Sequence, residues 1–345
     1  MNYYKELHCK NGTVLSIDKL ILEFRLDYHE RDNAAKVMYM LEEDLGIEFV
    51  QWISGKCGSF HFNFKFPCSD GNSFWMGLCL NEAEGKSDGG KRCRIEFNPN
   101  KVADDEIFWK VYGLLYYFCH APDVVRFDLA CDYPVRRDSC YLIKDGRKYA
   151  EYRNSEADKT QYLGCHSNHG FVKLYNKQIE SRLPIPLTRL ELTLDWKLRG
   201  WDEVKKIFPE VLVCDEFQMR FDSEQISSTE KFILLSVLRN PDMLNDMKLL
   251  GYRKRKKIEC ILAEYTHKME IERVDYNNII TVIEDFVNWK FDFNKLHLHH
   301  FTDTPFGEFK DSEVFEKETE DKGDDKHNDF YATFSGLVAN SEEQG

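Results

Sequence analysis

Apolar and polar residues alternate with a period of two in several stretches of this chain, and this pattern predicts β-strands with one buried face. In the segment 171–177, the alternation places Tyr175 on the polar face, away from the apolar Leu174. Lys173 and Lys177 share that face with the tyrosine. After a Pro-Ile-Pro connection, the segment 187–195 alternates again. We therefore expect two neighbouring strands whose polar face carries a tyrosine among cations.

The same patterns predict an α+β fold with an antiparallel sheet. Strand-like segments are 16–27, 47–57, 60–66, 73–80, 91–97, 124–133, 171–177 and 187–195. Helical spacing of apolar residues is found in 33–45, 104–119 and 201–208, and most of 223–293 has it as well. The first half therefore has the order β-α-β-β-β-β-α.

The second half of the chain echoes the first. Arg94-Ile95-Glu96 on one predicted strand matches Arg189-Leu190-Glu191 on another. An ancient duplication would give two RRM-like or saddle-like antiparallel halves that join in one curved platform. We predict four parts: a first α+β half at 1–122, a second α+β half with the tyrosine at 123–215, a helical unit at 216–300 and a disordered acidic tail at 301–345.

Charge is distributed unevenly along the chain. The net charge is −13, but residues 302–345 contain 13 acidic and 4 basic residues, so they contribute 4 − 13 = −9. This composition predicts a disordered acidic segment. The run Tyr252–Lys257, YRKRKK, contains five cations: Arg253, Lys254, Arg255, Lys256 and Lys257. Such a run either forms a solvated helix face or contacts a phosphate backbone.

Several protein classes do not fit the sequence. The chain has eleven cysteines but no C-x-x-C pair, which argues against a zinc site or a disulfide framework. It has no apolar run of 18 residues, no signal peptide pattern at its N-terminus and no P-loop motif. We therefore expect a cytoplasmic protein that has no membrane partner and leaves nucleotide-driven work to other proteins.

Three stretches carry a family resemblance: RFDLACD at Arg126–Asp132, TQYLGCHSNHGFVKLYNKQIE at Thr160–Glu180 and RLELTL at Arg189–Leu194. They resemble the R-x-D-x-A-x-D strand, the T-x-Y-x-G-S-x-x-S…R-x-Y-[ND]-K…E stretch and the R-x-E strand of rolling-circle plasmid replication initiators of the Rep_trans type. That group also contains relaxases of integrative conjugative elements. Cys165 stands where the family has serine, and Lys173 where arginine is common.

The resemblance implies that a tyrosine nicks one DNA strand at a replication origin and stays attached to the 5′ end. Tyr175 is the matching residue, and a phenol with a pKa of about 10 needs positive charge or a metal nearby to act at neutral pH. Lys173, Lys177 and Arg189 are the candidate catalytic cations. The resemblance also implies single- and double-stranded origin DNA as partners, together with a host helicase and a second copy of the chain in a homodimer.

Carboxylates on the neighbouring strands offer hard oxygen ligands for Mg²⁺ or Mn²⁺. Asp128 and Glu191 are the first candidates, with Asp132 or Glu96 as a third ligand. For contact with the DNA backbone the candidates are Arg126 and the five cations of the YRKRKK run, which makes the helical unit the expected DNA-recognition part.

Other interpretations remain open at this stage. Asp128 and Glu191 equally suit ion pairs with neighbouring arginines on a solvated face. His297-Leu298-His299 has the His-apolar-His pattern of metal sites in other rolling-circle nucleases, but it follows the helical unit. In place of a replication initiator, the chain could be a conjugative relaxase or a DNA-binding regulator without enzyme activity.

Overall fold

The computed structural model describes residues 6–25, 51–52, 62–68, 71–79, 92–119, 121–155, 157–214, 226–239, 243 and 249–288. All of them lie in one compact unit, Met1–Phe291. Three predictions lie outside the described residues: the helix at 33–45, the acidic tail at 301–345 and the role of His297-Leu298-His299. The division of the chain into four parts stays a prediction.

One large antiparallel sheet dominates the described part of the chain and has eleven strands there. Its strands are β1 (Leu7–His8), β2 (Val14–Arg25), β3 (Gln51–Trp52), β4 (Phe62–Pro67), β5 (Ser73–Cys79), β6 (Arg92–Phe97), β7 (Asp123–Tyr133), β9 (Tyr149–Arg153), β10 (Lys159–Leu163), β11 (Val172–Asn176) and β12 (Thr188–Asp195). The order is β3-β4-β5-β6-β2-β7-β12-β11-β10-β9, and β1 pairs with β2.

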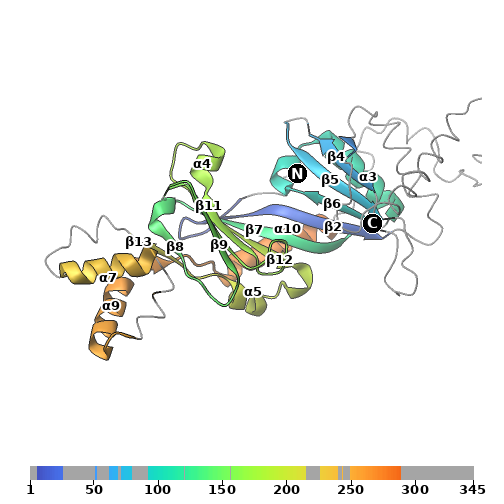
Figure 1. Ribbon diagram of the computed structural model, residues 1–345. Helices are drawn as coiled ribbons and strands as arrows, with labels where there is room; N and C mark the ends of the chain where they lie inside the picture. Colours follow the sequence, from blue (N-terminus) through green and yellow to red (C-terminus); the bar gives the residue numbers. More distant parts are fainter. Residues whose placement is uncertain are drawn as a thin grey trace, which may run out of the picture. The chain divides into compact units, whose positions relative to one another are not determined.

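The two halves of this sheet have the same strand order. In each half, four consecutive strands form a meander, β3 to β6 in one and β9 to β12 in the other, and the last strand of the meander pairs with a long strand that comes earlier in the chain. The two long strands, β2 and β7, pair with each other at the centre (Figure 1). The predicted α+β class with two antiparallel halves is therefore confirmed.

Alternation along β7 and β12 produces a tightly packed apolar face. Leu129 on β7 pairs with Leu192 on β12, and both side chains are fully buried. Arg189 and Thr193, on the other face of β12, are also buried, with exposed fractions of 9% and 6%. The charged face of this strand is therefore largely covered at these two positions, while Glu191 and Asp195 on the same face remain partly exposed.

The described helices are α2 (Pro99–Val102), α3 (Glu106–Cys119), α4 (Lys177–Ser181), α5 (Trp201–Ile207), α7 (Ser228–Arg239), α9 (Tyr252–Tyr265) and α10 (Arg273–Asn288), with short 3-10 turns η2 (Arg137–Ser139) and η3 (Trp196–Leu198). Apolar residues of α10 recur at helical spacing, and Tyr276, Ile279, Ile283 and Phe286 are buried. Phe286 contacts Phe97 of β6 with ring centroids 5.7 Å apart. Helix α10 therefore packs on the large sheet.

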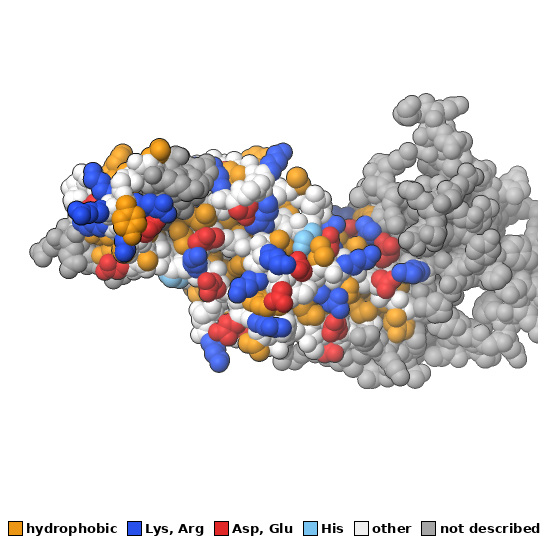
Figure 2. Space-filling model, turned by 90° about the horizontal axis from the view of Figure 1, so that it is seen from below, with side chains coloured by type: hydrophobic (Ala, Val, Ile, Leu, Met, Phe, Trp, Pro, Cys, Tyr) orange, Lys and Arg blue, Asp and Glu red, His pale blue; other side chains and the backbone are white. Residues whose placement is uncertain are grey.

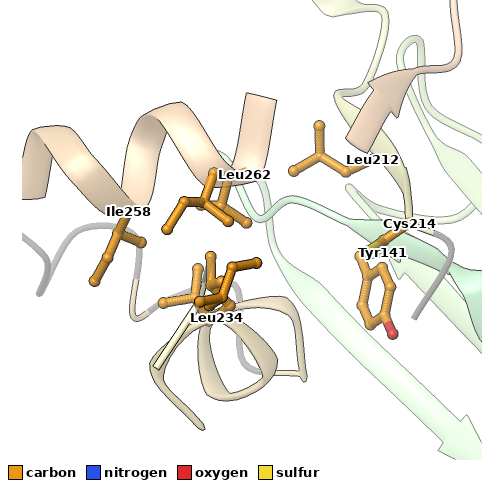
Figure 3. Packing of buried hydrophobic residues seen from close by; sticks show 9 residues of the cluster. Tyr141, Leu212, Cys214, Leu234, Ile258 and Leu262 are labelled. Atoms are coloured by element: carbon orange, nitrogen blue, oxygen red, sulfur yellow. The ribbon is translucent and has the colours of Figure 1, made fainter. Parts of the chain in front are cut away.

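A second, smaller sheet has the order β14-β13-β8, formed by β8 (Cys140–Leu142), β13 (Val211–Cys214) and β14 (Thr266–Lys268). Helices α7 and α9 share an apolar core with it, as Figure 3 shows. Its members are Tyr141, Leu212, Cys214, Ile226, Leu234, Val237, Ile258, Ile261 and Leu262. The stretch 223–293, predicted as mostly helical, thus also contributes a strand. None of the described helices is long and apolar enough to cross a membrane.

We predict that Leu234→Ala destabilises this second core by about 2–5 kcal/mol, because Leu234 is fully buried and the substitution leaves a cavity. Denaturant unfolding followed by circular dichroism measures the change. Phe232→Ala on the same helix is the control, since Phe232 is 73% exposed and its loss is expected to stay within about 0.5 kcal/mol. Equal effects of the two substitutions would contradict the packing of α7 described above.

Candidate functional site

Tyr175 lies near the end of β11 and faces β12. Its Cα partner there is Arg189, and its hydroxyl donates a hydrogen bond of 2.6 Å to Oε1 of Glu191. The alternation of β11 turns Leu174 to the opposite, apolar face, as the sequence predicts. The side chain is only 5% exposed, although the sequence pattern predicted an open position among cations. The phenol is therefore held in one place by packing and by a carboxylate.

Two lysines flank the tyrosine ring. Nζ of Lys173 lies 3.9 Å from the centre of the ring and 3.6 Å from Oε2 of Glu191. Nζ of Lys177 lies 5.9 Å from the same ring centre and forms an ion pair with Glu180. A cation over an aromatic face is attracted by the ring's quadrupole. The structure thus brings Lys173 and Lys177 to Tyr175, with Lys173 in the closer contact.

Burial changes the acidity of both partners in the tyrosine hydrogen bond. The pKa of Glu191 is raised by desolvation and by the nearby charge of Asp18, which outweigh Lys173 and the Tyr175 hydroxyl. The pKa of Tyr175 is raised well above its ordinary value by desolvation and by Glu191 itself. The phenol therefore keeps its proton at rest, and Glu191 accepts a proton more readily than an exposed glutamate does.

Arg189 forms a buried ion-pair clamp. Its Nε and Nη2 each lie 2.7 Å from an oxygen of Asp132, and its Nη1 lies 2.9 Å from Asp18. Asp132 was predicted as a metal ligand, but both of its carboxylate oxygens accept hydrogen bonds from Arg189, whose charge neutralises it. The guanidinium acts on Tyr175 through its charge, which lowers the pKa of the phenol against the larger opposing effects of burial and Glu191.

Asp18 belongs to this site although the sequence analysis did not select it. It sits at a β-bulge, since the pairing of β2 with β7 shifts between Ile17 and Lys19. A bulge inserts one residue into the strand and redirects its side chain. A strict period-two interpretation of SIDKLILEF cannot detect such an insertion, so the sequence held no signal for Asp18.

Asp128 and Glu191 lie on neighbouring strands of the same face. Asp128 is the Cα partner of Thr193, which is two residues beyond Glu191 on β12. Desolvation raises the pKa of Asp128, against a hydrogen bond from Thr193 and the charge of Lys19. The described residues contain no group of three His, Cys, Asp or Glu side chains arranged to hold a metal ion.

The first half has an equivalent place without a tyrosine. Arg94 bonds Glu23 at 2.8 Å, as Arg189 bonds Asp132 in the second half. The Cα partner of Arg94 on β5 is Gly77, whereas the partner of Arg189 on β11 is Tyr175. Glu96, predicted as a further metal ligand, forms an ion pair of 2.6 Å with Lys19. Among the described residues, the arginine of this pair therefore lies opposite a tyrosine in the second half and opposite a glycine in the first.

The basic cluster Arg253, Lys254, Arg255, Lys256 and Lys257 occupies the first turns of α9. Arg255 pairs with Glu259 at 2.7 Å, and Lys257 pairs with Glu230 at 2.5 Å. Arg253, Lys254 and Lys256 are exposed. In Figure 2, Lys and Arg side chains gather at the left end, where α7 and α9 lie. The first turn of α9, all of it described, has no acidic residue.

Cations at the N-terminal end of a helix are disfavoured, because the helix dipole is positive there. The cluster therefore costs stability in the free protein, and a bound anion would relieve that cost. Arg126, the remaining candidate for DNA contact, lies on β7 and pairs with Asp195 at 3.2 Å. It is thus apart in sequence from the α9 cluster and has an acidic partner of its own.

No protein family model matches the chain. Curated relatives do match: a protein named Replication initiation protein from Staphylococcus aureus is 31% identical over 94 residues, and a second of the same name and organism is 29% identical over 94 residues. These stretches cover 27% of this chain and 30% of each relative, so most of the relatives' length has no counterpart in the match.

Among solved structures, a match is the rolling circle replication initiator protein from Geobacillus stearothermophilus. It is 17% identical, with a TM-score of 0.32, and the match covers 57% of this chain and 79% of that one. The curated relatives confirm what the three sequence motifs predicted, namely that the chain is similar to replication initiation proteins.

Proposed function

We propose that this protein is a rolling-circle replication initiator that nicks and rejoins one strand of DNA, with Tyr175 as the nucleophile. The observation that carries the proposal is the 2.6 Å hydrogen bond from the Tyr175 hydroxyl to Glu191. It joins a potential nucleophile to a potential base, which is the basic unit of nucleophilic catalysis. The names of the curated relatives support the choice of an initiator over a conjugative relaxase or a regulator without activity.

In the proposed reaction, Oη of Tyr175 attacks the scissile phosphorus while its proton passes to Glu191. The bond from phosphorus to the 3′ oxygen breaks, that oxygen leaves with the electron pair and takes a proton from solvent, and a 5′-phosphotyrosine ester remains. One phosphate ester replaces another, so the energy of the broken bond is conserved. Rejoining is the reverse of these steps and needs no nucleotide.

The flanking cations have distinct tasks in this reaction. Lys173 lies over the ring and beside Glu191, so its ammonium group can stabilise the phenolate as the proton leaves. Lys177 is farther from the ring and can approach the phosphate once it separates from Glu180. Arg189 stays bonded to two carboxylates and keeps β12, and with it Glu191, in position.

A divalent cation, Mg²⁺ or Mn²⁺, completes the proposal. Mg²⁺ in proteins is commonly held by one or two carboxylates together with substrate phosphates and waters. Asp128 and Glu191 would be the protein's carboxylates in this arrangement, since they lie on neighbouring strands of one face and burial raises the pKa of each. When bound, the cation would neutralise charge on the scissile phosphate. Asp132 and Glu96 are left out because Arg189 and Lys19 already neutralise them.

Origin DNA is the proposed partner of the α9 cluster. Exposed cations on a helix that lacks acids in its first turn suit the phosphates of a duplex. Phosphate contacts hold and orient DNA but do not read its bases. We therefore assign α9 to duplex holding and Tyr175 to the unpaired scissile strand. A host helicase that opens the duplex and a second copy of the chain complete the set of proposed partners.

We predict that Tyr175→Phe abolishes nicking while DNA binding and the fold are retained. The substitution removes the attacking oxygen, and the lost hydrogen bond to Glu191 is expected to lower stability by only about 1 kcal/mol. Relaxation of supercoiled plasmid bearing the cognate origin measures the activity, and mass spectrometry of protein mixed with an origin oligonucleotide detects the adduct. Tyr116→Phe, on α3, is the control and should nick like the parent. An adduct on the Tyr175→Phe protein would contradict the assignment.

We also predict that Asp128→Asn and Glu191→Gln each lose metal-dependent cleavage and that EDTA reproduces the loss in the parent protein. Calorimetric titration with Mn²⁺ gives a second readout, in which both variants should bind the ion more weakly than the parent. Glu96→Gln is the matched control, since it changes the glutamate in the equivalent place of the first half. Cleavage that resists the chelator would rule out the metal, whatever the variants do.

For the basic cluster we predict a change in duplex binding alone. Replacing Arg253, Lys254 and Lys256 with glutamine should weaken duplex binding and reduce the slope of log K against log salt by about 0.9 for each lost contact. Cleavage of a single-stranded oligonucleotide should continue. The triple change of Lys197, Lys205 and Lys206, also exposed, is the control. An unchanged salt slope would show that the α9 cluster is an ordinary solvated face.

A further inference from the structure

Four aromatic side chains form a continuous row across β9, β10 and the loop before β11. The rings of Tyr152 and Tyr162 lie edge to face, with centroids 5.8 Å apart. Tyr162 and Phe171 are also 5.8 Å apart and nearly parallel, at 21°. Phe171 in turn contacts His166 at 5.3 Å. We call these four residues the aromatic row.

The row lies on the same face of the sheet as Tyr175. Tyr162 is the Cα partner of Lys173, which in turn is the partner of Glu191, and paired residues of antiparallel strands point to one face. The pKa of Tyr162 is raised by desolvation, by Tyr152 and by the charge of Glu191. Tyr162, in the middle of the row, is therefore the member that faces the charge of Glu191, and Tyr152 on β9, the last strand in the sheet order, forms one end of the row.

Much of the row faces solvent. Tyr152 is 71% exposed, His166 is exposed, and Tyr162 and Phe171 are half-buried. An aromatic ring left open to water gives up most of the free energy that its burial would provide. Lys173 is the Cα partner of Tyr162, and its ammonium group lies over the ring of Tyr175. Flat apolar surfaces next to a cation complement a ligand that combines flat rings with negative charge.

We propose that the aromatic row is a stacking platform for the bases of unpaired DNA next to the phosphate that Tyr175 attacks. In a duplex, each base face is covered by the neighbouring bases, so only an unpaired strand presents faces for the rings. Stacking on aromatic side chains tolerates any base, and the platform would therefore hold the strand without reading it. The proposal rests on the proposed function for the position of the scissile phosphate, but strand binding can be measured without cleavage.

The test uses the full chain with Tyr175→Phe, so that no covalent product forms. Fluorescence anisotropy measures binding of a labelled oligothymidylate of about 12 nucleotides, and of an abasic strand of the same length that keeps the phosphates but has no bases. The parent should prefer the strand with bases. Tyr152→Leu and Tyr162→Leu should each weaken that binding about tenfold and leave abasic binding unchanged. The double variant should bind the two strands alike.

Two further variants keep the test specific. Tyr152→Phe retains the ring and should bind like the parent, which separates stacking from hydrogen bonding. Phe232→Leu removes an equally exposed ring, 73% accessible on α7, and should have no effect. The proposal is overturned if the leucine variants still prefer the strand with bases. It is also overturned if their affinity for both strands falls by the same factor, because phosphate contacts or the fold would then be responsible.

Failure of the row and failure of the proposed function give different results. If the leucine variants bind like the parent while Tyr175→Phe still abolishes cleavage, the nucleophile stands and the platform is wrong. If binding depends on the row but Tyr175→Phe still cleaves DNA, the platform stands and the proposed nucleophile is wrong. A parent that does not distinguish the two strands also overturns the platform.

Discussion

The buried guanidinium of Arg189 is the interaction on which the arrangement of the site depends. It belongs to β12, bonds Asp132 of β7 at 2.7 Å and bonds Asp18 of β2 at 2.9 Å, so three strands and both halves of the sheet meet at one cation. A buried cation is tolerable only when carboxylates compensate it, and removing one partner of such a pair commonly costs about 3–5 kcal/mol. Because β12 also carries Glu191, this clamp helps to position the carboxylate that accepts the hydrogen bond from Tyr175.

Comparison of the two halves separates the scaffold from the chemistry. Both halves pair an arginine of an R-x-E strand with an acid on the adjacent long strand, Arg94 with Glu23 and Arg189 with Asp132. The residue opposite this arginine on the neighbouring strand differs, since it is Gly77 in the first half and Tyr175 in the second. The glutamate of the R-x-E motif also has a different partner in each half. Glu96 forms an ion pair with Lys19, whereas Glu191 accepts a hydrogen bond from the hydroxyl of Tyr175. The arginine–acid pair is thus common to both halves, whereas the tyrosine and the lysines around it belong to the second.

Period-two alternation was sufficient to predict the strands that carry Tyr175 and Glu191, because each has one continuous apolar face buried against the core. It could not predict Asp18, whose position depends on a bulge, nor the strand β13, whose four residues are all buried and show no alternation. The packing partner of α10 could not be predicted either, because helical spacing of apolar residues shows that a helix has an apolar face but not what that face packs against. In the structure that face meets Phe97 of the first half and Trp201 near the end of the second.

Electrostatics at the resting site oppose ionisation of the phenol. Burial and the charge of Glu191 raise the pKa of Tyr175, whereas burial with Asp18 raises the pKa of Glu191 and makes this carboxylate a better proton acceptor. Proton transfer between them becomes favourable only when new positive charge stabilises the phenolate. A divalent cation that arrives with the phosphate and is held by Asp128 would add positive charge to the site, and Lys173 of the chain already lies over the phenol ring. Under the proposed mechanism, the same burial that makes the free tyrosine unreactive ties its activation to the arrival of DNA.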